Sequence, residues 1–572
     1  MKCVIIFLVS FLGVHLAVAQ ESEEAEQAIE YIKAQRLIAV RRAFDPSIDS
    51  LKEAEKILRA ALHYYTTSQV QELAKSNGRL FGSKNSILYD LATVKIKMKQ
   101  LDSAVILLID PLTGISKGFF KQMIEQESIF SEIRKHPTIV SIFNAQKAAE
   151  RLFNSDALST PYQPNISEDE KIAGLSKLWS EAKYNFAYFD HIPDLDWDRL
   201  YLEFLPKIRA TKSTVEYLNI LKLFCAQLHD GHTDVWANDP KLKDLTSLRP
   251  PFRTVLIEDK VFVQEVQHDS LEKIGIHPGL EVINIDGLPV KEYAELYVRP
   301  YQSGSTTQNI DVATYTYRLL YGPKDAPVDI TFKNAKGEIF SHKLPRTGYR
   351  NLKTRPSFSF QIIPNNIAYI QLNGFEDNKV LSGFKAAFDS IATTNALIID
   401  VRQNGGGDSG YGWSILACLT DKPMLTGFYS SRIYSPLRRS RGETVVFEPV
   451  DGGNIWPVNG KYHYTKPVVV LTSGRTFSAA EDFVLVFDTM KRGTIIGEPT
   501  GGSTGQPLLF ALPGGVMARV CTKRDMYPDG KEWNGKGIQP DLLVRPTAFD
   551  FQAGRDTVLE AAKKYLEANN KK

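Results

Sequence analysis

Residues 468–482 read Val-Val-Val-Leu-Thr-Ser-Gly-Arg-Thr-Phe-Ser-Ala-Ala-Glu-Asp, and this stretch decides the fold of the C-terminal half of the chain. Its first four residues form a short apolar run of the kind that is buried in a mostly parallel sheet. Ser478 then stands where this strand-like run hands over to a helix. A hydroxyl at that point lies beside the free N–H groups of the first helical turn, which can stabilise an oxyanion.

Ser478 also has a purely structural interpretation. Glu481 follows it by three residues, and this spacing matches the capping box, in which the serine only satisfies an unpaired N–H group. For an isolated Ser-x-x-Glu pattern, the structural interpretation is the more frequent one. The choice therefore depends on what the rest of the chain supplies.

Two other stretches supply parts that an acyl-transfer enzyme needs. The apolar run 396–401 is followed by Arg-Gln-Asn-Gly-Gly-Gly at 402–407, and Leu-His-Asp-Gly-His-Thr occupies 228–233. A serine, a histidine and a glycine-rich turn after a buried strand are those parts. The glycines at 405–410 also spell Gly-x-Gly-x-x-Gly, but a dinucleotide site needs an acidic residue about twenty positions later, and Asp421 comes too early.

These stretches resemble, in one order, the motifs of C-terminal-processing (tail-specific) serine peptidases, in the subgroup related to the core of tricorn protease. The matching segments are Leu-His-Asp-Gly-His-Thr at 228–233, Leu-Ile-Ile-Asp-Val-Arg-Gln-Asn-Gly-Gly-Gly at 397–407, Thr-Ser-Gly-Arg-Thr-Phe-Ser-Ala-Ala-Glu-Asp-Phe at 472–483 and Gly-Lys-Gly-Ile-Gln-Pro-Asp at 535–541. The resemblance implies an exported peptidase that hydrolyses protein or peptide substrates through an acyl-enzyme. The alternative is a catalytically silent, peptide-binding scaffold.

The resemblance implies that Ser478 is the nucleophile, and one departure from the family pattern selects its base. The lysine-dependent branch carries its base in a Thr-x-Gly-Lys-Gly segment, whereas this chain has Thr-Gly-Gly-Ser-Thr at 500–504. Ser503 occupies the lysine position. The histidine of the Gly-His-Thr motif, His232, is then the expected base, and replacing Ser503 by alanine is expected to leave most of the activity.

A histidine base needs a partner that fixes its tautomer and stabilises the imidazolium. In tricorn-like relatives this partner is a glutamate near the Gly-x-Gly-Ile-x-Pro-Asp segment, and Glu532 is the candidate here. Asn534 stands where some relatives have glutamate. Gly231 stands where tricorn has a serine, so that hydroxyl is missing or is supplied elsewhere.

The backbone N–H groups of Ala479 and Gly406 are the expected oxyanion hole, because glycine lets the backbone approach a substrate closely. Asp400 and Arg402 are expected to hold the glycine loop in shape. No cofactor is implied. His229 and His232 have the i, i+3 spacing of metal ligands, but the glycine between them and the lack of a further histidine-rich partner argue against a metal site.

The whole chain is predicted to be a multidomain α+β protein. In order, we expect a signal peptide at 1–19, a helical domain with tetratricopeptide-like spacing at 22–157, a helical bundle that carries the base histidine at 165–245, a PDZ-like β domain at 251–346, an α/β crossover-type catalytic domain at 358–551 and a C-terminal helix at 552–572. Apolar runs at 366–372, 396–401, 468–471 and 494–496 predict the strands of the catalytic sheet, and 384–391 predicts a helix. A PDZ module adds a peptide strand to an exposed sheet edge, which would suit an enzyme that trims tails.

The first nineteen residues and the composition predict the compartment and the partners. A lysine, an apolar stretch and Ala-Val-Ala at 17–19 are typical of a cleaved signal peptide, so we expect an exported chain, periplasmic or extracellular, with no membrane span after cleavage. The net charge of +3 is close to neutral for 572 residues, and no basic block is interleaved with aromatic residues, which argues against nucleic acid. The oligomeric state is not predicted.

Overall fold

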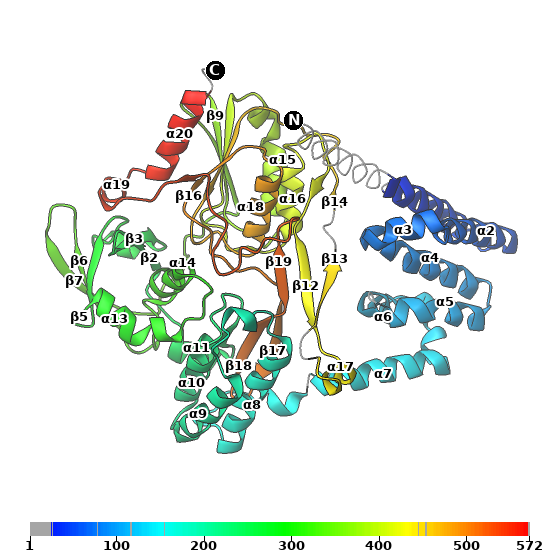
Figure 1. Ribbon diagram of the computed structural model, residues 1–572, viewed down its shortest axis with the longest axis horizontal. Helices are drawn as coiled ribbons and strands as arrows, with labels where there is room; N and C mark the ends of the chain where they lie inside the picture. Colours follow the sequence, from blue (N-terminus) through cyan, green and yellow to red (C-terminus); the bar gives the residue numbers. More distant parts are fainter. Residues whose placement is uncertain are drawn as a thin grey trace. The chain divides into compact units, whose positions relative to one another are not determined.

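The computed structural model describes residues 24–25, 27–76, 78–114, 117–153, 155–443, 446–451 and 455–569 (Figure 1). The signal peptide predicted at 1–19 lies outside these residues. The chain divides into two compact units, of which the first comprises 1–155 with 451–455 and the second comprises 156–450 with 456–572. Within the described ranges, no helix combines the length and the apolar character that a bilayer crossing requires.

The first unit is helical. After a helix at 27–42 it contains α2 (Ile48–Tyr65), α3 (Ser68–Ser76), α4 (Gly78–Lys97), α5 (Leu101–Thr113), α6 (Lys117–Gln126) and α7 (Pro137–Phe153), with short 3₁₀ turns at Ser128–Phe130 and Ile133–Lys135. Leu51, Ala54 and Leu58 of α2 are buried with helical spacing. Lys95 of α4 forms an ion pair with Glu55 of α2 at 2.7 Å. Helix α2 therefore packs against α4, although α3 lies between them in the chain.

The second unit begins with three helices, α8 (Glu168–Asn185), α9 (Trp197–Ala210) and α10 (Thr214–Ala226), followed by the short α11 (Pro240–Thr246). Serine or aspartate side chains cap all three long helices, which explains where each begins. Their apolar faces, including Phe186 and Phe224, share a core with a three-stranded antiparallel sheet. This sheet has the order β1 (Asp234–Ala237), β18 (Val516–Cys521) and β17 (Pro507–Leu512). The pairing of β1 with β18 therefore joins the segment after His232 to a strand near the end of the chain.

A second, antiparallel sheet has the order β2 (Phe252–Ile257), β3 (Lys260–Val266), β4 (Glu281–Ile285), β6 (Val328–Lys333) and β7 (Ile339–Leu344), with β5 (Leu288–Pro289) paired to β4. Asp286 and Gly287 both have positive φ, as a two-residue hairpin turn requires. The short helices α12 (Asp269–Glu272) and α13 (Val290–Tyr297) and the 3₁₀ turn Arg299–Tyr301 lie between these strands in the chain. Helix α14 (Thr307–Asp311) continues into a π-helical segment, Val312–Arg318, that packs against β2.

The third sheet forms the centre of the C-terminal half of the chain. Its order is β20 (Leu542–Leu543), β16 (Thr494–Gly497), β15 (Val468–Thr472), β10 (Ala396–Asp400), β9 (Ile367–Leu372) and β8 (Phe358–Ile363). All pairs are parallel except β8 with β9. The four strands and the helix predicted from apolar runs are confirmed, since the helix at 384–391 lies within α15 (Lys379–Ala392).

Helices cover both faces of this sheet, which is why β10 and β15 are buried along their whole length. One face packs on α15, α16 (Ser409–Leu416) and α18 (Ala479–Thr489), and the other packs on α20 (Thr557–Asn569). Figure 1 shows α16 and α18 beside the sheet and α20 at its other side. The predicted C-terminal helix at 552–572 corresponds to α20, preceded by the short α19 (Ala548–Gln552). Because the strands are parallel, the loops after β10 and β15 leave the same edge of the sheet.

The remaining elements of the C-terminal half are short. They are β11 (Met424–Leu425), β12 (Phe428–Ile433), α17 (Pro436–Ser440), β13 (Val446–Asp451), β14 (Ile455–Trp456) and β19 (Lys523–Met526). β12 pairs with β19, and β19 follows β18 directly in the chain. The residues between β18 and β20 therefore connect the three-stranded sheet, which contains β1 and β18, to β20 at the edge of the six-stranded sheet.

Candidate active site

Ser478 lies in a strained turn between β15 and α18. Its φ of 58° and ψ of −128° are unfavourable for a residue with a side chain, and such conformations concentrate at functional sites. The Ser478 Oγ lies 3.0 Å from His232 Nε2. The backbone N–H of Ser478 donates to Glu481 Oε2 at 3.2 Å, so the glutamate half of the capping box is present. The serine hydroxyl, however, is placed against a base.

His232 lies in the loop between α10 and β1 and is 4% exposed. Its ring stacks on Phe477 with a centroid distance of 4.7 Å and an interplanar angle of 8°. Burial, helped by the positive charges of Arg519 and Lys523, lowers the pKa of His232 well below the ordinary 6.5. The ring is therefore held flat against the residue before the nucleophile, in the neutral form that a general base requires.

Gly231 cannot carry the hydroxyl that tricorn has at this position. A Cβ atom on Gly231 would lie 2.7 Å from Asn309 Oδ1 and 2.9 Å from Phe477 Cζ. Phe477 is the ring on which His232 stacks, so it has little freedom to move away. Of the two possibilities that the sequence leaves open, the packing favours a hydroxyl supplied from elsewhere.

The second ring nitrogen of His232 meets Ser503. The distance from His232 Nδ1 to Ser503 Oγ is 2.9 Å, and Ser503 Oγ lies 3.2 Å from Asp230 Oδ1. The other oxygen of Asp230 accepts hydrogen bonds from the Thr233 hydroxyl at 2.7 Å and from the His232 N–H at 3.0 Å. Burial raises the pKa of Asp230, and these donors oppose the rise. Sequence reasoning missed both contacts, and its only signal was the aspartate two residues before the histidine.

Glu532 does not contact His232. Arg524 donates to both Glu532 oxygens, at 2.8 and 3.0 Å, and His191 lies 3.3 Å from one of them. The hydrogen bond from His191 and the pair with Arg524 lower the pKa of Glu532 to about 2. The expectation that Glu532 orients the base is therefore corrected, because a bidentate guanidinium holds this carboxylate. Glu532 and Asn534 instead line a neighbouring cavity of about 320 Å³.

The two expected oxyanion donors differ in their surroundings. Ala479 is the first residue of α18, so its N–H has no acceptor within the helix. Gly406 lies against the nucleophile, since a Cβ atom on it would be 2.7 Å from the Ser478 Cβ. Its N–H, however, donates to Asn404 Oδ1 at 2.9 Å. Only the Ala479 N–H is thus unengaged beside the nucleophile.

Glu481 ties the nucleophile turn to the loop that carries Ser503. This fully buried carboxylate accepts hydrogen bonds from the N–H groups of Ser478, Gly502 and Ser503, at 3.2, 2.8 and 3.1 Å, and from the Thr500 hydroxyl at 2.5 Å. Burial raises its pKa to about 8, while the four donors act in the opposite direction. Glu481 therefore acts as a clamp, whereas its spacing in the sequence suggested only a helix cap.

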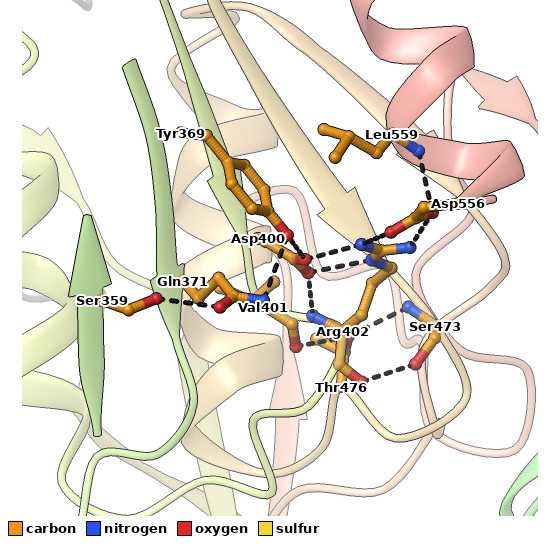
Figure 2. Close-up of polar contacts among 10 residues, drawn as sticks. All are labelled: Ser359, Tyr369, Gln371, Asp400, Val401, Arg402, Ser473, Thr476, Asp556 and Leu559. Carbon is orange, nitrogen blue, oxygen red and sulfur yellow. Dashed lines mark hydrogen bonds and ion pairs between the residues drawn. The ribbon is translucent and has the colours of Figure 1, made fainter. Parts of the chain in front are cut away.

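Asp400 and Arg402 hold the glycine loop, as the sequence predicts (Figure 2). The Arg402 guanidinium makes paired hydrogen bonds with Asp400, at 3.0 and 2.7 Å, and with Asp556 of the segment before α20, both at 2.7 Å. Tyr369 donates to Asp400 at 2.6 Å. The Arg402 carbonyl accepts from the Ser473 hydroxyl at 2.8 Å, so the loops after β10 and β15 are joined.

Metal binding has no support in this region. Asp230, which lies between His229 and His232 in the sequence, accepts hydrogen bonds from neighbouring groups. Across the part of the chain that the structure describes, no three histidine, cysteine, aspartate or glutamate side chains are grouped as metal ligands would be.

The comparisons with known proteins place this sheet in a family. Residues 366–544 match the model of peptidase family S41. The chain is 24% identical over 294 residues to the chloroplastic C-terminal processing peptidase of Tetradesmus obliquus, covering 50% of this chain and 57% of that protein. It is 28% identical over 229 residues to the chloroplastic carboxyl-terminal-processing peptidase 2 of Arabidopsis thaliana, covering 39% and 41%. The chain thus spans about half the length of these relatives.

A solved structure supports the fold beyond the matched segment. Mature CPAF in complex with lactacystin superposes with a TM-score of 0.57 and 16% identity, covering 70% of this chain and 98% of that one. At this identity the likeness shows the fold alone. The match spans β9 to β20 and includes both loops that meet at Ser478, so residues 366–544 are the part of this chain that is similar to peptidase family S41, a family of serine-type peptidases.

Proposed function

We propose that this chain hydrolyses peptide bonds in protein or peptide substrates through an acyl-enzyme on Ser478, with His232 as the general base. The observation that carries the proposal is the 3.0 Å contact between Ser478 Oγ and His232 Nε2, made by a strained turn and a buried ring. An alkanol is a weak nucleophile near neutral pH and needs such a base. The lowered pKa of His232 keeps the imidazole neutral and able to accept the proton.

The reaction proceeds in two halves. Ser478 Oγ attacks the scissile carbonyl carbon while His232 Nε2 takes the hydroxyl proton, and the imidazolium then gives that proton to the leaving amine. In the second half, His232 takes a proton from the water that attacks the acyl carbon, and the imidazolium returns this proton to Ser478 Oγ as the carbon–oxygen bond breaks and the acid leaves. The Ala479 N–H faces the developing oxyanion. We keep Gly406 as the second donor, and its N–H must leave Asn404 Oδ1 to act.

Capture of a substrate tail by strand addition has less support. β2 is one edge strand of its sheet, and the segment 312–318 contacts it. The Thr254 hydroxyl of β2 donates to the carbonyl of Tyr315, and the Arg253 guanidinium lies 5.1 Å from the centre of the Tyr317 ring. We therefore propose that this PDZ-like domain acts as a structural support. Export rests on the pattern at residues 1–19 alone.

The rival function, a silent peptide-binding scaffold, predicts a serine without activation. A fluorophosphonate probe separates the two, because it phosphonylates only an activated serine. We expect wild-type protein to be labelled and folded Ser478→Ala protein to remain unlabelled, with loss of peptide hydrolysis in parallel. A wild-type chain that folds but takes no label, or a folded Ser478→Ala variant that hydrolyses peptides at the wild-type rate, would refute the assignment. A profile of cleaved peptides would then define the substrate class.

A further inference from the structure

We propose that Asp230, acting through the Ser503 hydroxyl, is the acidic partner that orients His232 and stabilises its imidazolium. Both are positioning residues, since neither side chain contacts the Ser478 hydroxyl; the Ser503 carbonyl accepts a hydrogen bond from the Ser478 backbone N–H at 3.3 Å. The inference rests on the proposed function of Ser478 and His232 and extends it to the group that the sequence assigned to Glu532. It also gives Ser503 a role, although the sequence treats this residue only as a substituted lysine.

The geometry forms one continuous chain of hydrogen bonds. Ser478 Oγ lies 3.0 Å from His232 Nε2, on one side of the imidazole ring. On the other side, His232 Nδ1 lies 2.9 Å from Ser503 Oγ, which in turn lies 3.2 Å from Asp230 Oδ1. Ser503 is completely buried, and Asp230 is 1% exposed. Water therefore does not compete for these partners, and each contact is stronger than it would be at the surface.

The carboxylate sets the direction of the chain. Ionised Asp230 can only accept, so the Ser503 hydroxyl donates its single proton to Oδ1. The Ser503 oxygen is then an acceptor for His232, which requires the proton on Nδ1. Nε2 is consequently unprotonated and faces the Ser478 hydroxyl, as a general base must. A serine without the aspartate could donate to Nδ1 instead and leave the wrong tautomer.

The other nearby carboxylates accept hydrogen bonds from groups other than His232. Both oxygens of Glu532 are held by Arg524. Glu481 already accepts three backbone N–H groups and a threonine hydroxyl. Asn534, at the position where some relatives have glutamate, is an amide. Among the residues that the structure describes, Asp230 is thus the carboxylate whose hydrogen bonds lead to His232 Nδ1.

The relay is held in place from both sides. The Asp230 backbone N–H donates to Ser303 Oγ at 3.2 Å, and the Ser303 hydroxyl donates to the Asp230 carbonyl at 2.7 Å. On the opposite side, Glu481 holds the Ser503 N–H at 3.1 Å. Thr233 bonds both to Asp230 and, through its oxygen, to the N–H of Cys521 in β18. A positioning function requires this kind of support.

Several charged or titratable groups surround the relay. Arg519 of β18 and Lys523 of β19 bring positive charge toward His232 and lower its pKa, and Arg519 also acts on Asp230. Cys521 of β18 lies on the same side, and burial raises the pKa of its thiol well above the ordinary 9.0. Glu481 of α18 faces the Ser503 loop. Because burial and two cations disfavour the imidazolium, a negative partner has most effect when His232 takes the serine proton.

The test measures the second-order rate of fluorophosphonate labelling against pH in the full chain. Asp230→Asn removes the charge but keeps the size of the side chain, and Ser503→Ala removes the relay. We expect each to lower the plateau rate on the order of 10²-fold, less than the roughly 10⁴-fold loss when the aspartate of a direct triad becomes asparagine. In Asp230→Asn, the pH range over which the labelling rate rises to its plateau (the pH limb) should move to lower pH, because the imidazolium loses its negative partner.

A double variant tests whether Asp230 and Ser503 act as one unit, which a purely structural role would not require. If Asp230 acts through Ser503, the combined Asp230→Asn and Ser503→Ala variant should lose little more than either single variant, because residues that act as a unit are not additive. Ser176→Ala is the matched control, since its hydroxyl contacts the Ile172 carbonyl and the Tyr201 hydroxyl in the helical bundle. It should retain the wild-type pH limb.

The outcomes separate this inference from the proposed function. Wild-type labelling with an unchanged plateau and pH limb in folded Asp230→Asn or Ser503→Ala overturns the relay and leaves Ser478 and His232 in place. Multiplicative losses in the double variant, or a limb that shifts in Glu532→Gln instead, also overturn it. If Asp230→Asn fails to fold by circular dichroism, Ser503→Ala decides, because Asp230 keeps its Thr233 and backbone donors. Absence of labelling in the wild type refutes the proposed function itself.

Discussion

At the scale of single residues, the site depends on which partner each side chain meets. Ser503 stands at a lysine position in the sequence, yet its hydroxyl contacts His232 Nδ1. Glu532 stands near the family motif, yet Arg524 holds it. The same residue type therefore has a different role when a stronger partner competes for it, because a bidentate guanidinium binds a carboxylate more tightly than a neutral imidazole does.

The pH dependence of activity follows from the burial of His232. We propose that the neutral imidazole is the base, and kcat/KM should then fall as pH falls through the pKa of His232. Burial and two neighbouring cations lower that pKa, so the fall should be centred below the ordinary value of 6.5. A pH profile of kcat/KM with a peptide substrate measures this. A rising limb centred above pH 6.5 would contradict it.

The residue before the base should tolerate no side chain. Gly231→Ser places a Cβ atom 2.9 Å from Phe477 Cζ, and displacing that ring disturbs the surface on which His232 stacks. We expect a loss of stability of about 1–3 kcal/mol, typical of overpacking, together with a reduced labelling rate. Denaturant unfolding and probe labelling measure the two effects. Gly460→Ala is the control, because nothing lies within 4 Å of its added Cβ. Equal stability of the two variants would refute the packing argument.

At the scale of elements, a buried ionic cluster joins three of them. Arg402 follows β10, Asp556 precedes α20, and Ser473 begins the nucleophile loop after β15. Figure 2 shows the Arg402 guanidinium between the carboxylates of Asp400 and Asp556. Because Asp400 is almost completely buried, its charge has no adequate partner without Arg402. The cluster therefore determines how the glycine loop leaves the sheet.

Arg402→Met should destabilise the chain strongly at neutral pH. It leaves a buried carboxylate with only the Tyr369 hydroxyl and the backbone N–H of residue 402, and removing one partner of a buried pair costs about 3–5 kcal/mol. Denaturant titration measures it. Arg199→Met is the control, since that arginine forms an exposed pair within α9, and it should change stability by less than about 0.5 kcal/mol.

The difference between wild type and Arg402→Met should also depend on pH. Burial raises the pKa of Asp400, but the charge and hydrogen bonds of Arg402 outweigh burial, so its pKa lies below 3.8 in the folded chain. A depressed folded pKa stabilises the protein above the unfolded pKa, and this contribution is lost as pH falls through the folded value. The cost of the substitution should thus shrink as pH falls below about 4, and it should grow above that pH because burial raises the pKa of the unpaired Asp400 in the variant. A cost that is constant down to pH 2 would exclude this linkage.

At the scale of the whole molecule, the site assembles from segments that are far apart in the chain. Ser503 and Asp230 are separated by 273 residues, and His232 and Ser478 by 246. The segment before α14 also reaches the site, because the hydroxyls of Ser305 and Thr306 donate to the carbonyls of Gly502 and Gly501, both at 2.7 Å. The antiparallel β domain is thereby connected to the loop that carries Ser503.

Substrate recognition should not depend on a free carboxylate bound at β2. The segment 312–318 contacts β2, which is one of the two edge strands of its sheet. We expect peptides that differ only in a C-terminal acid or amide to have kcat/KM values within about 3-fold of each other, since strand addition is the mode that would distinguish them. Competition kinetics with a matched peptide pair measures the ratio. A strong preference for the acid would show that the tail is captured, at β2 or at another site.

The sequence by itself determined the parts that depend on local pattern. The apolar runs of the sheet and the helix start at Ser478 follow from neighbouring residues, because periodicity and turn chemistry act over short distances. The histidine of the Gly-His-Thr motif is assigned through the resemblance to the peptidase family. The tertiary structure decided the partner of His232. Asp230 and Ser503 meet only because β1 pairs with β18 and Glu481 holds the 500–504 loop by hydrogen bonds. Glu532 forms an ion pair with Arg524 instead of contacting His232. Competition among charged side chains is settled by distance in space, which no local pattern encodes.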